Sequence, residues 1–376
     1  MPATPKKSQS HSVLSDVSTV GVYALLRLVL PPAAPAPPRE RDFAEPSSRQ
    51  EPLALQKIRA GEPGRGRLAA TPLQIPWRGW KDILWRTYQQ IMEDRLLAIA
   101  AGVVFYGLLA LFPAVTALVS LYGLFASAST IQGHLDFLSG VLPGAVVGIV
   151  DEQIGRVVAK GDIKLSFGFA FGLGLALWSA NAGMKAMIDA LNIVYEEDEK
   201  RGFFRLNLVS LTMTLAAIVA LLLAIAAVVA MPLVLDNFGL KSLTGSLVGL
   251  ARWPALMLGT LLALALLYRY GPSRREAKWA WLSVGSVIAT LSWLAGSAAF
   301  SYYLEKYAHY DATYGSLGAA IGLMMWMWMT AIVILVGAEL NSEVEHQTAV
   351  DTTEGRPKPL GARGATMADT VGAARE

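Results

Sequence analysis

The sequence has 376 residues, of which 54% are hydrophobic and 16% are charged, and its formal net charge is +3 at pH 7. A mean hydropathy of +0.43 is too apolar for an ordinary soluble domain and indicates an all-α, polytopic membrane protein. Much of the Lys and Arg lies in the N-terminal region or in short loops between apolar runs, so we expect no nucleic-acid partner. Cysteine is absent and the four histidines are far apart, so we expect no metal ion and no other cofactor.

Residues 1–76 are predicted to form a disordered Pro/Arg-rich tail, because stretches such as PPAAPAPPRERD cannot bury a core. The apolar run at 20–30 is too short to span a membrane, and no usual cleavage site follows a basic start, which argues against a signal peptide. A start codon assigned too far upstream is an alternative for residues 1–70. Residues 346–376 are predicted to form a second disordered tail.

Between the tails, residues 77–345 are predicted to form a membrane domain. Apolar residues recur at three- and four-residue spacing over 77–94, which predicts an amphipathic helix along the membrane surface, and a second amphipathic piece is expected at 144–158. Apolar runs predict about six transmembrane helices, at 96–125, 165–184 (continuing to 195), 206–231 (ending before Pro232), 253–268, 280–303 and 314–343.

Basic residues near the span ends predict the orientation. More of them flank the first span and the connections between spans two and three and between four and five than lie on the other side. By the positive-inside rule, both termini are expected in the cytoplasm.

The sixth span has no charged residue from position 315 to 337, and four of its glycines share one helical face: Gly315, Gly318, Gly322 and Gly337. Such a face allows a neighbouring helix to approach closely. Trp326 and Trp328 lie near mid-span, where an indole N–H has no water, so at least one of them requires a hydrogen-bond partner on a neighbouring helix. The glycines Gly168 and Gly172 predict similar packing for span two.

Span two also carries a polar stripe: Trp178, Asn181, Lys185, Asp189 and Asn192. Such residues in a span are candidates for lining a solute path, in which Asn181 bonds a polar ligand and Lys185 attracts an anion. In the alternative interpretation, Asn181 bonds a neighbouring helix, and Lys185 forms an ordinary i,i+4 ion pair with Asp189. Glu339 in span six is the second candidate. Its carboxylate either binds a proton or a coupling cation, or anchors the helix end at the water boundary.

Four motifs in order carry a family resemblance: LAIAAGVVFYGLLALFP at 97–113, LWSANAGMKAMIDALNIVY at 177–195, LYRYGP at 267–272, and YGSLGAAIGLMMWMW with VGAELNSE at the end. With them the stretch 77–345 resembles the YihY/BrkB family of bacterial inner-membrane proteins, which formerly carried the name ribonuclease BN. The resemblance implies six helices with cytoplasmic ends in the bacterial inner membrane, and it implies little about chemistry.

Three functional classes follow. We rank first a secondary transporter that exports small anionic or amphipathic solutes, because the sequence has polar span residues and no GxxxxGK[ST] nucleotide-binding loop. A non-catalytic factor for envelope integrity, assembly or lipid handling comes second, and a ribonuclease last, so we expect no enzyme. The expected partners are the lipid bilayer and a small solute. The glycine-rich spans also allow a homo-oligomer.

Overall fold

The computed structural model describes residues 53–123, 167–237, 241–306 and 316–375. Six long helices occupy the predicted span positions: α4 (Leu96–Gly123), α7 (Phe167–Val194), α8 (Phe203–Asn237), α9 (Lys241–Tyr270), α10 (Trp279–Lys306) and α12 (Ser316–His346). The shorter helices are α2 (Leu53–Ala60), η2 (Pro72–Gln74), α3 (Trp77–Glu93) and α13 (Thr366–Asp369). Within the described residues there is no strand, only an isolated bridge between Ala277 and Thr353. The all-α prediction is confirmed.

The long helices have 28 to 35 residues. At 1.5 Å per residue even the shortest reaches about 42 Å, more than a hydrocarbon core of about 30 Å. Three described segments meet the length and hydropathy of a membrane span on their own: Phe203–Leu223, Trp279–Lys306 and Ala320–His346, and shorter apolar segments lie at Leu96–Leu109 and Pro254–Tyr270. The chain is therefore an all-α membrane protein.

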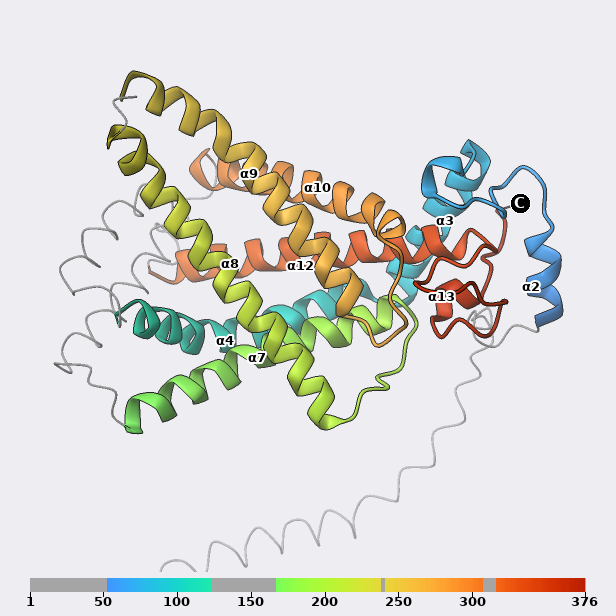
Figure 1. Cartoon of the computed structure of the whole chain (residues 1–376), viewed down its shortest axis with the longest axis horizontal. Coiled ribbons are helices and arrows are strands. Elements are labelled where there is room, and N and C mark those ends of the chain that lie inside the picture. Colours follow the sequence, from blue (N-terminus) through green and yellow to red (C-terminus); the bar gives the residue numbers. More distant parts are fainter. Residues whose placement is uncertain (1–52, 124–166, 238–240, 307–315, 376) are drawn as a thin grey trace, which may run out of the picture. The chain divides into compact units, whose positions relative to one another are not determined.

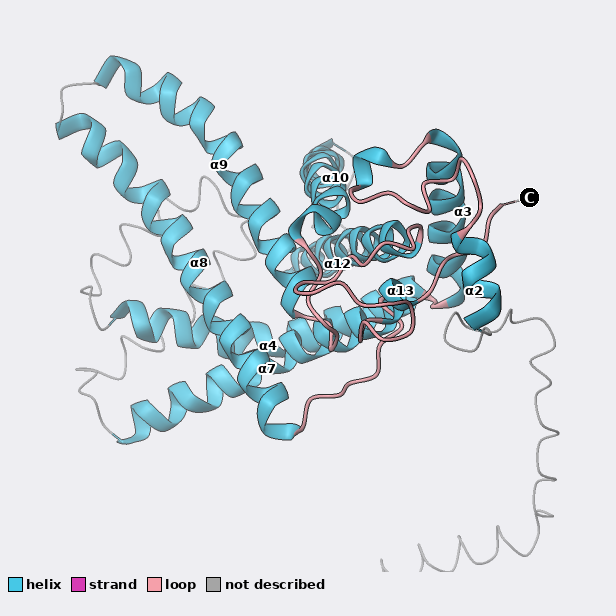
Figure 2. Cartoon of the chain, turned by 45° about the vertical axis from the view of Figure 1, so that its right-hand side comes forward, coloured by secondary structure: helices cyan, strands magenta, loops and turns pink. Residues whose placement is uncertain are grey.

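The helices pack in neighbouring pairs. Figure 1 shows α8 and α9 side by side and antiparallel, and α10 along α12, while α4 and α7 form a third pair. The main core lies where α4, α7, α9, α10 and α12 meet, around Leu191, Tyr268 and Leu335. At one end of these helices lie α2, α3, α13 and the C-terminus (Figures 1 and 2).

Close packing of α10 on α12 depends on Gly285 and Gly337. A Cβ atom at Gly285 would collide with the carbonyl oxygen of Gly337, and one at Gly337 would lie 2.6 Å from Ala289 Cβ and from the Tyr268 hydroxyl. Asn341 joins the two helices, because its Oδ1 accepts from the Gly285 amide at 2.7 Å and its Nδ2 donates to the Leu282 carbonyl at 3.2 Å.

Gly337 was among the glycines predicted to pack, and the other predicted packing glycines are described only in part. Gly318 and Gly322 are buried, and Gly322 faces Leu304 with room for a Cβ atom at 3.9 Å. Gly168 and Gly172 lie in α7 where the side-chain surroundings fall outside the description, and Gly315 lies outside the described residues, as does the amphipathic piece at 144–158.

The prediction that the mid-span indoles need partners is confirmed. Trp326 Nε1 donates to Ser297 Oγ of α10 at 3.2 Å. Trp328 Nε1 donates to the Leu97 carbonyl of α4 at 3.1 Å. Both bonds link α12 to a neighbouring helix.

Two predicted span boundaries are wrong. The helix α8 continues past Pro232 to Asn237, and α9 begins at Lys241, so that Pro254 lies inside it. A proline removes one backbone hydrogen bond, and a helix among other helices tolerates that loss.

The structure also differs from the disorder expected for the two tails, over the described residues 53–76 and 346–375. The C-terminal segment contains buried residues such as Met367, Ala368 and Val371. Arg363 holds it together by donating to the carbonyl oxygens of Ala349 and Ala368 at 2.6 and 2.5 Å. The tail composition suggested disorder, but Arg363 donates to backbone carbonyl oxygens of the C-terminal segment, and Arg67 of the N-terminal region donates to the carbonyl oxygens of Gln347 and Gly372.

Candidate functional site

The stripe on α7 faces α8 at Asn181. This asparagine is buried, and its Oδ1 accepts a hydrogen bond from Thr214 Oγ1 at 3.3 Å. Thr214 is also buried and donates to the Ser210 carbonyl of its own helix at 2.8 Å. A hydroxyl has one hydrogen to donate, so the longer bond to Asn181 competes with the shorter one. The Asn181 carbonyl is therefore only weakly satisfied by α8.

Lys185 lies one turn further along α7. Its Nζ donates to Asn207 Oδ1 of α8 at 2.5 Å and lies 5.0 Å from the ring centroid of Trp178, which is 56% exposed. Asp189 is exposed, and no carboxylate of the described residues lies within ion-pair distance of Lys185. The i,i+4 ion pair is therefore not the contact that this lysine makes.

Asn192 belongs to a different arrangement. Its Nδ2 donates to Glu199 Oε2 at 3.0 Å, and its Oδ1 accepts from the Ser273 amide at 2.7 Å. It therefore ties the end of α7 to the connections that follow α7 and α9. The structure brings Trp178, Asn181 and Lys185 together with α8, and it places Asn192 apart from them.

Glu339 has different neighbours from those of the stripe on α7. It lies in α12 and is completely buried, with its Oε1 3.3 Å from Ser342 Oγ and its Oε2 without a hydrogen-bond partner in the described structure. The carboxyl groups of Glu343, Asp94 and Glu196 act on it electrostatically. They come from α12, the α3–α4 junction and the end of α7, so the site is where three elements meet.

Asp94 is the half-buried member of this group, at the junction between α3 and α4. Burial, reinforced by the negative charges of Glu196, Glu93 and Glu343, raises the pKa of Asp94 to about 7. Its carboxyl group therefore changes charge near neutral pH.

This shift predicts a pH-dependent stability. The folded protein binds the Asp94 proton more tightly than the unfolded chain, whose pKa is near 4, so stability is lost as pH rises from about 4 to about 7. Asp94→Asn should remove that loss. The free energy of unfolding should rise at pH 8 by on the order of 1 to 2 kcal/mol, after allowance for partial exposure, and should change little at pH 4. Thermal midpoints in detergent at both pH values measure it. An equal shift at both would contradict the assignment to Asp94.

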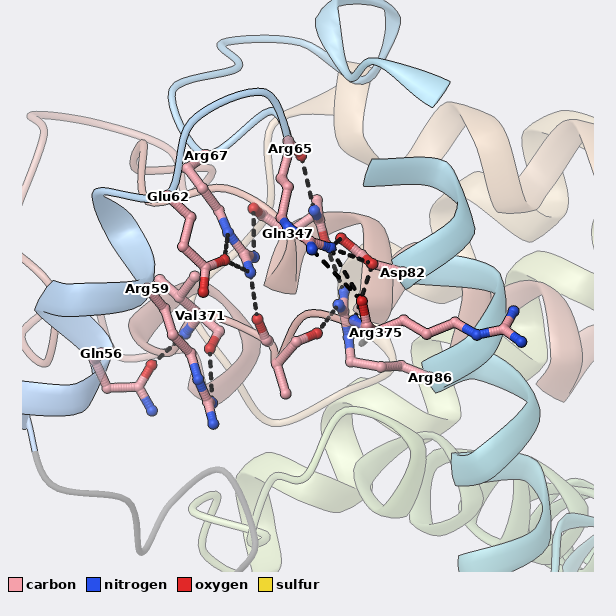
Figure 3. A network of polar contacts seen from close by, with 12 residues as sticks. Gln56, Arg59, Glu62, Arg65, Arg67, Asp82, Arg86, Gln347, Val371 and Arg375 are labelled. Atoms are coloured by element: carbon pink, nitrogen blue, oxygen red, sulfur yellow. Dashed lines mark hydrogen bonds and ion pairs between the residues drawn. The ribbon is translucent and has the colours of Figure 1, made fainter. Parts of the chain in front are cut away.

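A polar network that was not predicted from the sequence links α3, α12 and the C-terminal segment (Figure 3). Arg86 is buried, and its Nε donates to Glu343 Oε2 at 2.5 Å while its guanidinium also bonds Gln347 Oε1 and the Ala373 carbonyl, both at 2.8 Å. Nearby, both oxygens of Asp82 accept from Arg65 at 2.8 Å. The signal was present in the sequence, since Asp82 and Arg86 share one face of α3 at i,i+4 spacing.

A second buried ion pair lies beside this network. Arg274 donates to Glu345 Oε1 at 2.8 Å with both side chains fully buried, and its guanidinium lies 4.1 Å from the ring centroid of Tyr195. Thr352 of the C-terminal segment also donates to Glu345. These two buried carboxylates, Glu343 and Glu345, are thus paired with arginines, and Glu339 is the contrasting case.

An all-α bundle with apolar helices long enough to cross a bilayer, and with polar and ionisable side chains held between them, defines an integral membrane protein. The chain belongs to the family described as "Virulence factor BrkB", which matches residues 87–360. The family resemblance noted from the motifs is confirmed.

Curated relatives agree with this membership. The chain is 31% identical over 247 residues to the "Putative ribonuclease-like protein YfkH" of Bacillus subtilis, covering 65% of this chain and 88% of the relative. It is 26% identical to a "UPF0761 membrane protein" of Chlorobium luteolum (67% and 57% covered) and 25% identical to one of Aliivibrio salmonicida (68% and 81%). No solved structure matches the chain.

Proposed function

We propose that this protein is a secondary transporter that exports small anionic or amphipathic solutes across the bacterial inner membrane. The observation that carries the proposal is Lys185, a half-buried cation in the polar contact between α7 and α8 that no carboxylate of the described residues neutralises. A half-buried charge is costly unless it serves a ligand or finds a partner.

The surroundings of Lys185 fit an anion. An ammonium group has three N–H donors, and the described residues supply one acceptor, the neutral Asn207 amide oxygen. The Trp178 ring stabilises the cation without neutralising it. One turn deeper, the weakly satisfied Asn181 offers a further polar contact, and the indole of Trp178 offers an apolar surface to an amphipathic solute.

The topology proposed with this function has about six passes and both termini in the cytoplasm. Its support is the clustering of arginines at one end of the bundle, where Arg65, Arg67, Arg86 and Arg274 bond the helix ends and the C-terminal segment. We also propose that the glycine-rich long helices contact a second copy of the chain.

One observation favours a second candidate, a non-catalytic factor for envelope assembly or lipid handling. The outer face of α3 exposes Trp77, Leu84 and Tyr88, and Lys81 lies 6.0 Å from the Trp77 ring centroid. Exposed aromatic and basic residues on one helix face suit the headgroup region of a bilayer.

The ribonuclease activity suggested by the name of the Bacillus relative ranks last, and the described residues bring together no group of three or more His, Asp or Glu side chains suited to a metal ion.

The test is solute flux into liposomes that contain the purified protein, with a panel of organic anions, with and without a pH gradient. We expect the parent to carry at least one anion, and Lys185→Gln to reduce its flux by about ten- to a hundredfold, because losing a charge-assisted contact costs about 1.5 to 3 kcal/mol. Asn181→Ala should have a smaller effect.

The matched control is Lys57→Gln, which removes an exposed lysine on α2, away from the long helices. It should transport as the parent does. If the parent carries no anion of the panel, the transporter proposal is overturned for those solutes. Equal flux by Lys185→Gln and the parent would remove Lys185 from the path.

A further inference from the structure

We propose that Glu339 and Asp94 form a proton-binding site at the end of the bundle where α3, α7 and α12 meet. The deeper carboxyl group, that of Glu339, holds the proton, and the half-buried Asp94 exchanges it with water. The ligand is a proton, and nothing else in the structure assigns a role to either side chain.

Glu339 lacks the hydrogen bonds that would stabilise a buried carboxylate. Its Oε2 has no partner in the described structure. Its Oε1 lies 3.3 Å from Ser342 Oγ, but that hydroxyl has one hydrogen and lies closer, at 2.8 Å, to the Glu339 carbonyl oxygen. The carboxyl group therefore has no dedicated donor, although it is completely buried.

Glu339 also lacks a counter-ion among the described residues. Arg86 is the cation on the facing helix α3, and it is engaged by Glu343 at 2.5 Å and by Gln347 and the Ala373 carbonyl. The structure records no ion pair to Glu339 among the described residues. A buried carboxylate without a donor or a cation is far less stable than a neutral carboxyl group.

Several titratable side chains surround Glu339. From α12 come Glu343, which is paired with Arg86, and His346, whose Nδ1 lies 3.6 Å from Glu343. From the end of α7 come Glu196, which accepts from Gln90 Nε2 of α3 at 3.1 Å, and the fully buried phenol of Tyr195, on which Glu339 acts electrostatically. Glu93 and Asp94 lie at the end of α3. The neighbouring charges that act on Glu339 are all carboxylates, so they attract a proton and oppose a further negative charge.

Asp94 gives the site access to water. Asp94 is half-buried and ends the surface helix α3, and its pKa of about 7 allows it to take up and release a proton near neutral pH. A proton from water binds the Asp94 carboxylate and then passes to the Glu339 carboxylate, which restores the charge on Asp94. The pair holds one proton throughout this transfer, and once Glu339 is neutral a second proton binds Asp94 near neutral pH.

The test is infrared difference spectroscopy of the purified parent in lipid nanodiscs, which distinguishes a protonated carboxyl group from a carboxylate. We expect a protonated-carboxyl band at pH 7 that disappears in Glu339→Gln and shifts without disappearing in Glu339→Asp. A second component that titrates near neutral pH should be lost in Asp94→Asn. The control Glu305→Gln removes an exposed carboxyl group on α10 and should leave both features intact.

A Glu339→Gln spectrum identical to that of the parent in the protonated-carboxyl region would overturn the proposal. A band that appears only after sodium is replaced by a large organic cation would also overturn it, because it would identify a metal-cation site. No solute is needed, so the result is independent of whether the protein transports anions. Only the use of this proton for coupling rests on the proposed transport function.

Discussion

Replacing Gly285 by alanine is expected to prevent α10 from packing on α12. A Cβ atom at this position would collide with the Gly337 carbonyl oxygen and lie 2.6 Å from Asn341 Cγ and Oδ1. The backbone cannot yield as a flexible side chain would, so the helices must separate, at a cost of about 1 to 3 kcal/mol. The same shift would break the bond from the Gly285 amide to Asn341. The expected result is a large loss of monodisperse protein after detergent extraction and a lower thermal midpoint.

Gly259 and Gly102 supply matched controls, because a Cβ atom at either would meet nothing within 4 Å. Alanine is the better helix former, so Gly259→Ala and Gly102→Ala should leave the midpoint unchanged or raise it slightly. If Gly285→Ala behaved as these controls do, the close approach of α10 and α12 would be refuted.

The positions of the long helices could be predicted from the sequence because each is a long apolar run, and burial in lipid requires that a spanning segment satisfies its own backbone. The boundaries at Pro232 and Pro254 could not, because proline stops an isolated helix but not one supported by its neighbours. The 3.6-residue period showed that glycines of the sixth span share a face. It could not show that Gly337 is the one that meets another glycine, since that depends on the register of α10 against α12.

Prediction of the candidate site was limited in a similar way. The period placed Asn181, Lys185 and Asn192 on one stripe, but Asn192 lies at the helix end and bonds Glu199 and Ser273. Whether the Lys185 ammonium pairs with Asp189 or bonds Asn207 depends on where α8 packs. No local sequence pattern predicts that packing. The order in the C-terminal segment was missed because its composition is polar, whereas its stability comes from arginines that bond to carbonyl oxygens far away in sequence.

The second large effect is expected at Arg86, which joins α3 to α12 and to the C-terminal segment. Arg86→Met keeps much of the side-chain volume but leaves the fully buried Glu343 without its cation and removes the bonds to Gln347 and the Ala373 carbonyl. Removal of one partner from a buried pair costs about 3 to 5 kcal/mol, because the remaining charge is uncompensated. Arg78→Met, on the exposed face of α3, is the matched control and should change the thermal midpoint little.

A double variant separates the buried charge from the other contacts of Arg86. Replacing Glu343 by glutamine in the Arg86→Met protein removes the orphaned charge, so we expect it to recover part of the lost midpoint, while Glu343→Gln alone should destabilise by leaving Arg86 unpaired. A double variant less stable than the sum of the two single changes would contradict the pairing of Arg86 with Glu343. Recovery would also support the contrast on which the proton site depends: in α12 the buried Glu343 is held by a cation, whereas Glu339, one turn away, has none among the described residues.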